Sequence, residues 1–257
     1  MITPRLLLDN KYIKAIVTLT MLDRPITTLF LIESLDGKIS TGDVDELDVD
    51  KDFKRIVGVR EGLHQYYELE QKTDWHSLNT GRVMAKIGVN KRTEEPKKID
   101  VNFIIIDNKP HLNKKGVAYL AKWVKTLYLV TTNKQHPAYS LKQQYPNIEI
   151  VEYVKDIDLA DLLRKMKEQY KAEKITIQSG GTLNSAWIRA GLIDKVSIVV
   201  APCLIGGKNT QGLIGGESLH TEEDLKMIKA LRLISCKKLE NNYLHLIYTV
   251  INKTTIL

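Results

Sequence analysis

The stretch KITIQSGGTLNSAWIRAGLIDKVSIVVAP, residues 174–202, reads as a strand, a glycine pair, a helix, a short turn and a second strand. Apolar residues from Leu183 to Ala190 fall on one face of the predicted helix, and Gly191 is placed to end it. A strand, helix and strand in this order are typical of two parallel strands joined by a helical crossover. The stretch therefore predicts an α/β protein.

Further short runs rich in β-branched and aromatic residues occur along the chain. They are TTLFLIE (27–33), VNFIII (101–106), TLYLV (126–130) and IEIV (148–151), beside KITIQ (174–178) and KVSIVV (195–200). Several are apolar at consecutive positions, as strands covered on both faces are. Between the runs 148–151 and 174–178, Asp158 is a natural N-cap for a helix with apolar residues at helical spacing. We expect a mostly parallel, mixed sheet with helices on both faces.

The end of the chain predicts a different arrangement. Residues 231–239 and 243–250 form two long strand patterns around Asn241 and Asn242, which tolerate a positive φ and suit a hairpin turn. The sheet should therefore finish with an antiparallel hairpin. From the length of 257 residues we expect a single domain, in which residues 1–25 are an N-terminal extension and residues 27–250 the core.

The composition is that of an average globular protein, with 43% apolar and 27% charged residues. It argues against collagen-like, disordered and membrane-spanning classes. Lysine and arginine exceed aspartate and glutamate by 38 to 31, and the net charge of +7 suits anionic small molecules as well as nucleic acid. Because the chain has no motif of interleaved aromatic and basic residues, we expect a small-molecule substrate and no nucleic-acid partner.

The cysteines and the hydropathy predict the compartment. Cys203 and Cys236 imply no disulfide framework, and both are expected in the core. No segment approaches the ~18 apolar residues needed to cross a bilayer, and charged residues between Arg5 and Lys14 interrupt the apolar start of the chain. We expect a cytoplasmic protein with no membrane association.

The acidic stretch from Asp43 to Asp52 invites comparison with a calcium-binding loop. A loop beginning at Asp48 would place Phe53 where a glycine must turn the chain and Val59 where a bidentate glutamate must bind. We therefore interpret the stretch as a solvated loop. The histidines and cysteines have no zinc-ligand spacing, so we expect no metal. The sequence also has no nucleophile elbow, P-loop or standard Rossmann glycine motif.

Gly180 and Gly181 stand between a predicted strand and a predicted helix. Glycines there allow the backbone to approach a ligand closely, and the N–H groups that open the helix face that ligand with the positive end of the helix dipole. The pattern predicts a diphosphate-binding turn. A tight strand-to-helix turn without a ligand is the alternative.

The run SGGTLNSAWIRAGLIDKVSIVVAPCLIGG, from Ser179 to Gly207, resembles the signature of the riboflavin-biosynthesis reductase domain, the C-terminal half of the bifunctional deaminase-reductase. That family shares the dihydrofolate reductase fold. SLDGKI, from Ser34 to Ile39, and NTGRV, from Asn79 to Val83, are similar to two further family segments and occur in family order. The resemblance covers roughly residues 27–250.

Three differences from the family pattern stand out. Lys195 replaces an acidic residue, Met84 displaces a threonine expected after Gly-Arg, and the acidic stretch from Asp43 to Asp52 takes the place of a Ser-x-Trp. The motif of the zinc deaminase half is also missing from the sequence, which predicts a stand-alone reductase.

The resemblance implies an NADPH-dependent reductase that transfers hydride to a C=N bond of a pyrimidine-derived or pterin-like substrate. The implied activity is most similar to that of 5-amino-6-(5-phosphoribosylamino)uracil reductase. A reductase of another small molecule and a non-catalytic nucleotide-binding paralogue are the alternatives. The resemblance also implies a homodimer, paired through the apolar strands 231–239 and 243–250.

The resemblance further implies roles for particular residues. The diphosphate would bind at the glycine pair and Thr182, and Arg82 would hold the 2′-phosphate, an exposed surface arginine being the alternative. Lys38 and Asp36 would flank the reacting carbon and supply or stabilise a proton, whereas a turn cap at Asp36 and a solvated or phosphate-binding Lys38 are the alternatives. Asp194 is expected to be structural. The candidate cofactor-binding residues are Ser34, Gly37, Gly81, Arg82, Val83, Ser179, Gly180, Gly181, Thr182 and Leu183.

Overall fold

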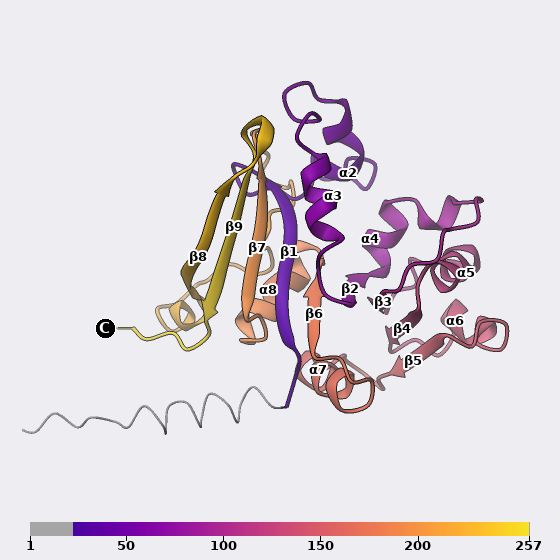
Figure 1. Cartoon of the computed structure of the whole chain (residues 1–257). Helices are drawn as coiled ribbons and strands as arrows, with labels where there is room; N and C mark the ends of the chain where they lie inside the picture. Colours follow the sequence, from indigo (N-terminus) through magenta and orange to yellow (C-terminus); the bar gives the residue numbers. More distant parts are fainter. Residues whose placement is uncertain (1–22, 257) are drawn as a thin grey trace, which may run out of the picture.

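A nine-stranded sheet runs through the computed structural model, which describes residues 23–256. Most of the expected N-terminal extension lies outside these residues. Within the described part, the strand order is β5-β4-β3-β2-β6-β1-β7-β9-β8. The neighbouring pairs from β5 to β7 are all parallel, and β9 and β8 add antiparallel pairs (Figure 1). The strands are β1 (Ile26–Ser34), β2 (His76–Thr80), β3 (Asn102–Ile106), β4 (Thr126–Thr131), β5 (Ile148–Glu152), β6 (Lys174–Ile177), β7 (Lys195–Ala201), β8 (Ala230–Lys238) and β9 (Leu244–Ile251).

Strand β2 is the one that the sequence patterns missed, whereas the six shorter runs and the two C-terminal strands are confirmed. Its sequence HSLNT holds one large apolar side chain, Leu78, which is fully buried. Ser77 is buried too, and its hydroxyl donates to Gln178 Oε1 at 3.0 Å. Partners from distant parts of the chain therefore make this polar segment a strand between β3 and β6.

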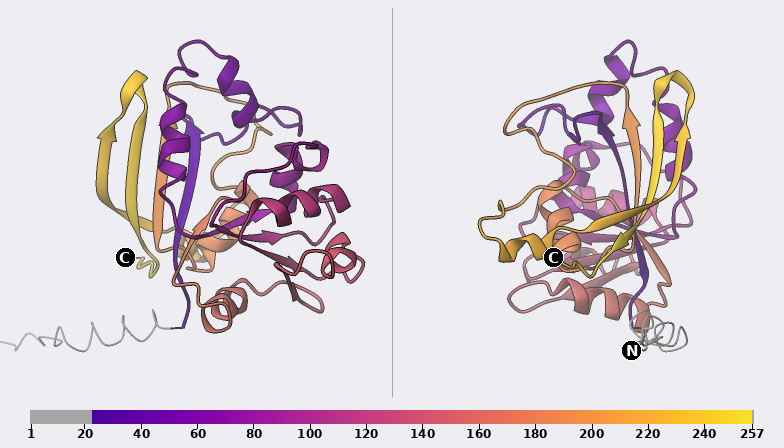
Figure 2. Two further views of the ribbon diagram at one scale, coloured as in Figure 1. Left: turned by 45° about the vertical axis from the view of Figure 1, so that its right-hand side comes forward. Right: turned by 90° about the vertical axis from the view of Figure 1, so that its left-hand side faces the viewer.

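Helices cover both faces of the sheet, as predicted. Leu162 and Met166 of α7 and Trp187 of α8 belong to a core on one face. Val117 of α5 and Tyr66 of α3 belong to cores on the other (Figure 2). The helices are α2 (Val49–Asp52), α3 (His64–Glu70), α4 (Gly81–Lys86), α5 (Lys114–Trp123), α6 (Pro137–Leu141), α7 (Leu159–Glu168) and α8 (Gly181–Arg189), with 3-10 turns η1 (Phe53–Arg55), η2 (Val89–Lys91), η3 (Glu223–Met227) and η4 (Glu240–Asn242).

Predicted helix ends and turns are also confirmed. Asp158 Oδ1 accepts hydrogen bonds from the backbone N–H groups of Ala160 and Asp161 and so caps α7. Gly191, just after α8, has a φ of 68°. Asn241 and Asn242 take φ values of 52° and 65° between β8 and β9. These residues adopt the left-handed backbone that tight chain reversals require.

The expected structural role of Asp194 is confirmed. Its carboxylate accepts hydrogen bonds from the Thr27 backbone N–H at 2.8 Å and from two nitrogens of Arg24, each at 2.8 Å. The carboxylate thus joins the start of β1 to the turn before β7. The cysteines differ from expectation, because Cys203 is half-buried and Cys236 is exposed on the edge strand β8.

Only the first half of the acidic stretch 43–52 is the solvated loop expected from its charge: residues 43–47 are exposed, whereas the chain from Asp48 onward is folded into α2. Asp48 is only 8% exposed, and its Oδ1 caps α2 by accepting the Asp50 N–H at 2.9 Å. Its Oδ2 pairs with Lys86 Nζ at 3.1 Å, and both side chains are largely buried. Burial of Val49 beside this pair holds the segment against the body of the protein.

Within residues 23–256, no helix is long and apolar enough to cross a membrane.

Candidate functional site

A cavity of about 740 Å³ lies where the three landmark segments of the sequence meet. It is lined by Lys38 after β1, by Arg82 and Val83 of α4 after β2, and by the turn from Ser179 after β6. Strands β2, β6 and β1 are neighbours in the sheet and run parallel, so their carboxyl ends meet at one edge. Figure 1 shows α2 at this end of the sheet, where ligands of open α/β sheets characteristically bind.

The N-terminus of α8 opens onto this cavity. Ser179, Gly180, Thr182 and Leu183 are lining residues, and the N-cap Gly180 provides no side-chain hydrogen bond to the helix. The first N–H groups of a helix have no partner within it. An uncapped helix start of this kind favours an anionic ligand.

Gly181 packs against the loop that follows β7. A Cβ at this position would clash with the backbone oxygen of Gly212 and lie 3.2 Å from the Gly215 nitrogen, and Gly181 is not a lining residue. The Gly215 N–H donates to Gly181 O at 2.9 Å. The missing side chain therefore makes room for the loop after β7. Asn184, which accepts from the Ser179 hydroxyl at 2.6 Å, reinforces this by donating to Leu213 O at 2.9 Å.

The turn after β1 is built around Asp36. Gly37 has a φ of 75°, and the Ser34 hydroxyl donates to Asp36 Oδ1 at 2.5 Å. The carboxylate also accepts the N–H groups of Ile205 at 3.0 Å and Gly206 at 2.6 Å. The hydrogen bond from Ser34, helped by the two backbone bonds, lowers the pKa of Asp36 to about 2. Asp36 is thus ionised at neutral pH and fastens the loop after β7.

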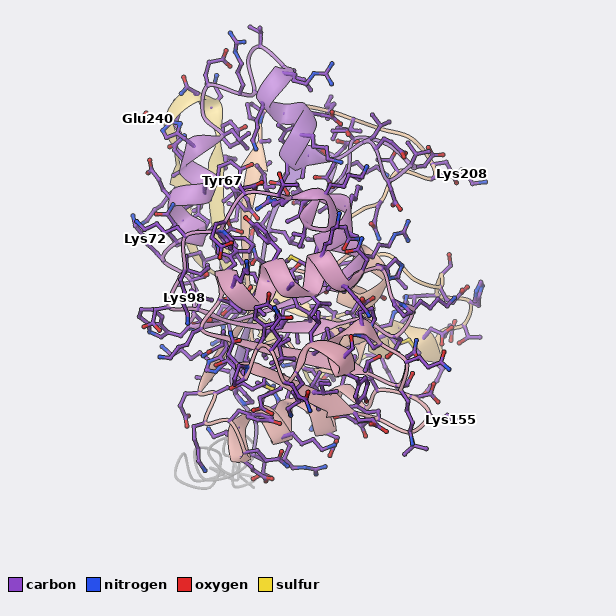
Figure 3. The ribbon with its side chains drawn as sticks, turned by 90° about the vertical axis from the view of Figure 1, so that its right-hand side faces the viewer. Tyr67, Lys72, Lys98, Lys155, Lys208 and Glu240 are labelled. Carbon is purple, nitrogen blue, oxygen red and sulfur yellow. The ribbon has the colours of Figure 1, made fainter. Side chains whose placement is uncertain are left out.

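Lys38 and the following Ile39 line the cavity, whereas Ser34, Asp36 and Gly37 are not among the lining residues. Lys38 Nζ donates to Gly207 O and to Thr210 O, each at 3.1 Å. The same loop carries Lys208, which also lines the cavity and lies at the loop's outer end in Figure 3. Two cations therefore face the cavity from this side.

Arg82 lies at the rim, with 63% of its side chain exposed. Its Nη2 and Nε donate to Asp45 Oδ1 at 2.9 and 3.3 Å. This hydrogen bond is the largest cause of a lowered pKa at Asp45, which also lines the cavity. An acidic side chain thus occupies the guanidinium that was expected to bind phosphate. Met84, where the family pattern has a threonine, is buried in the core.

Gly81 lies behind the lining, above a buried carboxylate. A Cβ at this position would overlap the carboxylate of Asp107. Asp107 accepts hydrogen bonds from the N–H groups of His111 and Leu112, each at 3.0 Å, and contacts the His136 ring at 3.1 Å. Burial raises the pKa of Asp107, but these hydrogen bonds outweigh it and the net pKa is lowered. The sequence patterns did not predict this network, which packs against Gly81 at the start of α4.

A second group of lining residues that the patterns missed comes from the acidic stretch and the elements near it. Asp48, Asp50, Tyr66 and Gln178 line the cavity. Tyr67, beside Tyr66 on α3 (Figure 3), donates its hydroxyl proton to Asp50 Oδ1 at 2.9 Å. The signal for this group was available as an acidic run where the family has a Ser-x-Trp. Within the described part of the chain, no group of three His, Cys, Asp or Glu residues is arranged to hold a metal ion.

Comparisons with known proteins find relatives over most of the chain. A 2,5-diamino-6-ribosylamino-4(3H)-pyrimidinone 5′-phosphate reductase from Methanothermobacter thermautotrophicus is 23% identical over 222 residues, which cover 82% of this chain and 90% of the relative. The riboflavin biosynthesis protein RibD of Actinobacillus pleuropneumoniae is 32% identical over 75 residues, covering 29% of this chain and 20% of that protein. This chain therefore aligns with only about a fifth of that protein's length.

Solved structures share the fold at low sequence identity. RibD of Acinetobacter baumannii superimposes with a TM-score of 0.62 at 17% identity, covering 89% of this chain and 58% of that one. A pyrimidine reductase-like protein from Corynebacterium diphtheriae gives 0.59 at 13% identity, covering 91% and 94%. The model of the RibD C-terminal domain matches residues 25–245, a range that contains the three landmark segments and nearly the whole sheet. On this match, the chain belongs to the RibD C-terminal domain family.

Proposed function

We propose that the protein is an NADPH-dependent reductase of the riboflavin-biosynthesis type. It would reduce the C=N bond of a phosphoribosylaminopyrimidine, so that a ribosylamino group becomes a ribitylamino group. One observation carries the proposal: Lys38, Arg82 and the uncapped start of α8 line a single cavity of about 740 Å³. The activity named for the M. thermautotrophicus relative agrees with it.

The residues of the cavity fit the anionic parts of NADPH. The backbone N–H groups of Gly180 and Thr182 would hold the diphosphate at the positive end of α8. Arg82 would take the 2′-phosphate after releasing Asp45. Ser179, Val83 and Leu183 would contact the cofactor from the wall. NADPH, when bound, supplies the hydride.

Residues that do not line the cavity would position the residues that touch the ligands. Ser34 and Gly37 shape the turn that carries Lys38, and Gly81 and Gly181 allow α4 and α8 to pack closely. Because Asp36 is ionised and bound to Ile205 and Gly206, we propose it as a positioning residue and not as a proton donor. Lys38 would place a positive charge beside the reacting carbon or the substrate phosphate.

We further propose that one reductase domain over residues 27–250 acts as a homodimer. Its apolar edge strand β8 is exposed, and Leu233 and Ile234 are more than half accessible. A cytoplasmic location and the lack of a nucleic-acid partner remain predictions.

Mixing the protein with NADPH and 5-amino-6-(5-phosphoribosylamino)uracil, or its 2,5-diamino pyrimidinone counterpart, tests the function. We expect loss of the reduced nicotinamide absorbance and formation of a ribitylamino product. NADPH binding without turnover of either substrate would favour a reductase of another small molecule or a non-catalytic paralogue. A protein that leaves nicotinamide fluorescence unchanged would contradict every cofactor-binding interpretation.

A further inference from the structure

Reduction of a C=N bond requires a proton as well as a hydride, because the nitrogen gains electron density when hydride reaches the carbon. Asp36 is ionised and accepts three hydrogen bonds, and Lys38 Nζ donates to two backbone oxygens. The two residues that were expected to supply the proton are therefore already engaged in holding the loop after β7. The acidic wall of the cavity offers another candidate donor.

Asp50 lies in the first turn of α2 and lines the cavity with Ile32, Tyr66 and Gln178. Its Oδ1 accepts the Tyr67 hydroxyl at 2.9 Å, which fixes the orientation of the carboxyl group. Its Oδ2 has no hydrogen-bond partner among the described residues. One oxygen is thus anchored, and the other is free to meet a ligand in the cavity.

We propose that Asp50 is the general acid of the reduction. This rests on the proposed function. In the step, the Asp50 O–H bond breaks and a new N–H bond forms at the substrate nitrogen, while hydride from the reduced nicotinamide forms the C–H bond at the carbon. The products are the amine, the oxidised cofactor and the Asp50 carboxylate, which regains its proton from water.

The surroundings of Asp50 favour its protonated form. Burial is the largest cause that raises the pKa of Asp50, and the charge of Asp48 adds to it. The Tyr67 hydrogen bond and the charges of Lys54 and Lys86 act in the opposite direction, but the net pKa is raised. Glu70 of α3 also has a raised pKa, chiefly through burial, and the charge of Asp50 adds to the rise. A carboxyl group that holds its proton at higher pH is suited to acid catalysis.

The pH dependence of kcat/KM and the Asp50→Asn variant test the assignment. For the wild type we expect activity to fall as pH rises through the pKa of Asp50, because only the protonated carboxyl can donate. Asp50→Asn should lose about 10²- to 10⁴-fold in kcat and should lose that alkaline limb, while NADPH affinity stays within about twofold. Glu46→Gln is the matched control, since it removes an exposed negative charge from the same segment, outside the cavity lining.

Tyr67→Phe provides a second test that keeps the carboxyl group in place. It removes a hydrogen bond that lowers the pKa of Asp50, so the alkaline limb should move to higher pH. Wild-type rates in Asp50→Asn, or an unmoved limb in Tyr67→Phe, would overturn the assignment.

A carbon NMR titration of the free protein separates this inference from the proposed function. The Asp50 signal, identified by its loss in Asp50→Asn, should titrate above the ordinary range of an aspartate. A normal titration would overturn the general-acid assignment without any enzyme assay. A raised titration in a protein that reduces neither pyrimidine substrate would instead count against the proposed function.

Discussion

At the scale of single residues, Asp45 and the 2′-phosphate of NADPH would compete for Arg82. Arg82→Ala should weaken NADPH binding about ten- to a hundredfold, since a charge-assisted hydrogen bond contributes roughly 1.5–3 kcal/mol. NADH binding should change little, because the two cofactors differ only at the ribose 2′ position. Titrating both cofactors into the wild type and the variant measures the difference.

Asp45→Asn tests the same contact from the other side. Exposed ion pairs contribute about 0–1 kcal/mol, so freeing Arg82 should raise NADPH affinity by no more than about fivefold. Arg60→Ala is a suitable control, because Arg60 pairs with Glu61 and is not among the cavity-lining residues. Equal losses of NADPH and NADH in Arg82→Ala would show that Arg82 has a structural role. An unchanged affinity for both would place the 2′-phosphate elsewhere.

Glu33 on β1 predicts a pH dependence of stability. Burial raises its pKa from 4.5 to about 7, so the folded protein binds a proton there more tightly than the unfolded chain does. The stabilisation is therefore complete below pH 4.5 and is lost as pH rises through about 7. Allowing for partial exposure, we expect Glu33→Gln to raise the free energy of unfolding at pH 8 by roughly 1–2 kcal/mol and to have little effect near pH 4. Urea unfolding of both proteins at the two pH values measures this, with Glu46→Gln as the control.

At the scale of elements, the start of α8 and the loop after β7 form one unit. Gly181→Val should weaken NADPH binding, but through displacement of the loop, because the new side chain meets the Gly212 and Gly215 backbone. Overpacking of this kind typically costs about 1–3 kcal/mol, so we expect a lower Tm and faster proteolysis within residues 203–216. Thermal unfolding and limited proteolysis, followed by mass spectrometry, measure both effects.

Gly180→Ala is the control for this prediction. Its φ of −74° suits any residue, and the nearest obstacle is the Gln211 side chain at 3.3 Å, which can move. We expect this variant to keep a Tm and a proteolysis pattern close to those of the wild type. If Gly181→Val leaves the Tm and the proteolysis pattern unchanged but abolishes NADPH binding, the result would instead indicate that Gly181 contacts the diphosphate directly.

At the scale of the whole molecule, the described part of the sheet has an exposed edge at β8. Within residues 23–256, strand β8 at the edge of the sheet (Figure 2) pairs on one side only, with β9. Its residues Leu231, Leu233 and Ile234 are 46%, 53% and 55% exposed. A free apolar edge favours pairing with a second copy of the chain. We expect a dimer in light scattering at micromolar concentration. Replacing both Leu233 and Ile234 with lysine should yield a monomer of unchanged far-UV circular dichroism.

Val154→Lys is the control for the dimer, since Val154 is 94% exposed just after the opposite edge strand β5. It should leave the dimer intact. A monomeric wild-type protein would rule out the proposed pairing.

The sequence by itself determined most of the architecture, with strand β2 as the exception. The strand runs, the crossover from Lys174 to Pro202 and the Asn241–Asn242 turn are local patterns, and each is confirmed. Their physical basis is the hydrophobic periodicity and the backbone preferences of a few neighbouring residues. The family resemblance, and not the strand patterns, implied that Lys38, Arg82 and Gly180 belong to one site, and all three line the cavity.

The tertiary structure alone decided the chemistry of individual side chains. Asp36 binds the N–H groups of Ile205 and Gly206, about 170 residues along the chain, and Gly181 packs on a loop 30 residues later. The many charges of the acidic stretch predicted a solvated loop. The Lys86 contact and the Asp48 cap nevertheless fold its second half into the cavity wall. Hydrogen bonds, two of them from the distant residues Ile205 and Gly206, lower the pKa of Asp36, whereas burial raises the pKa of Asp50, so the two aspartates shift in opposite directions.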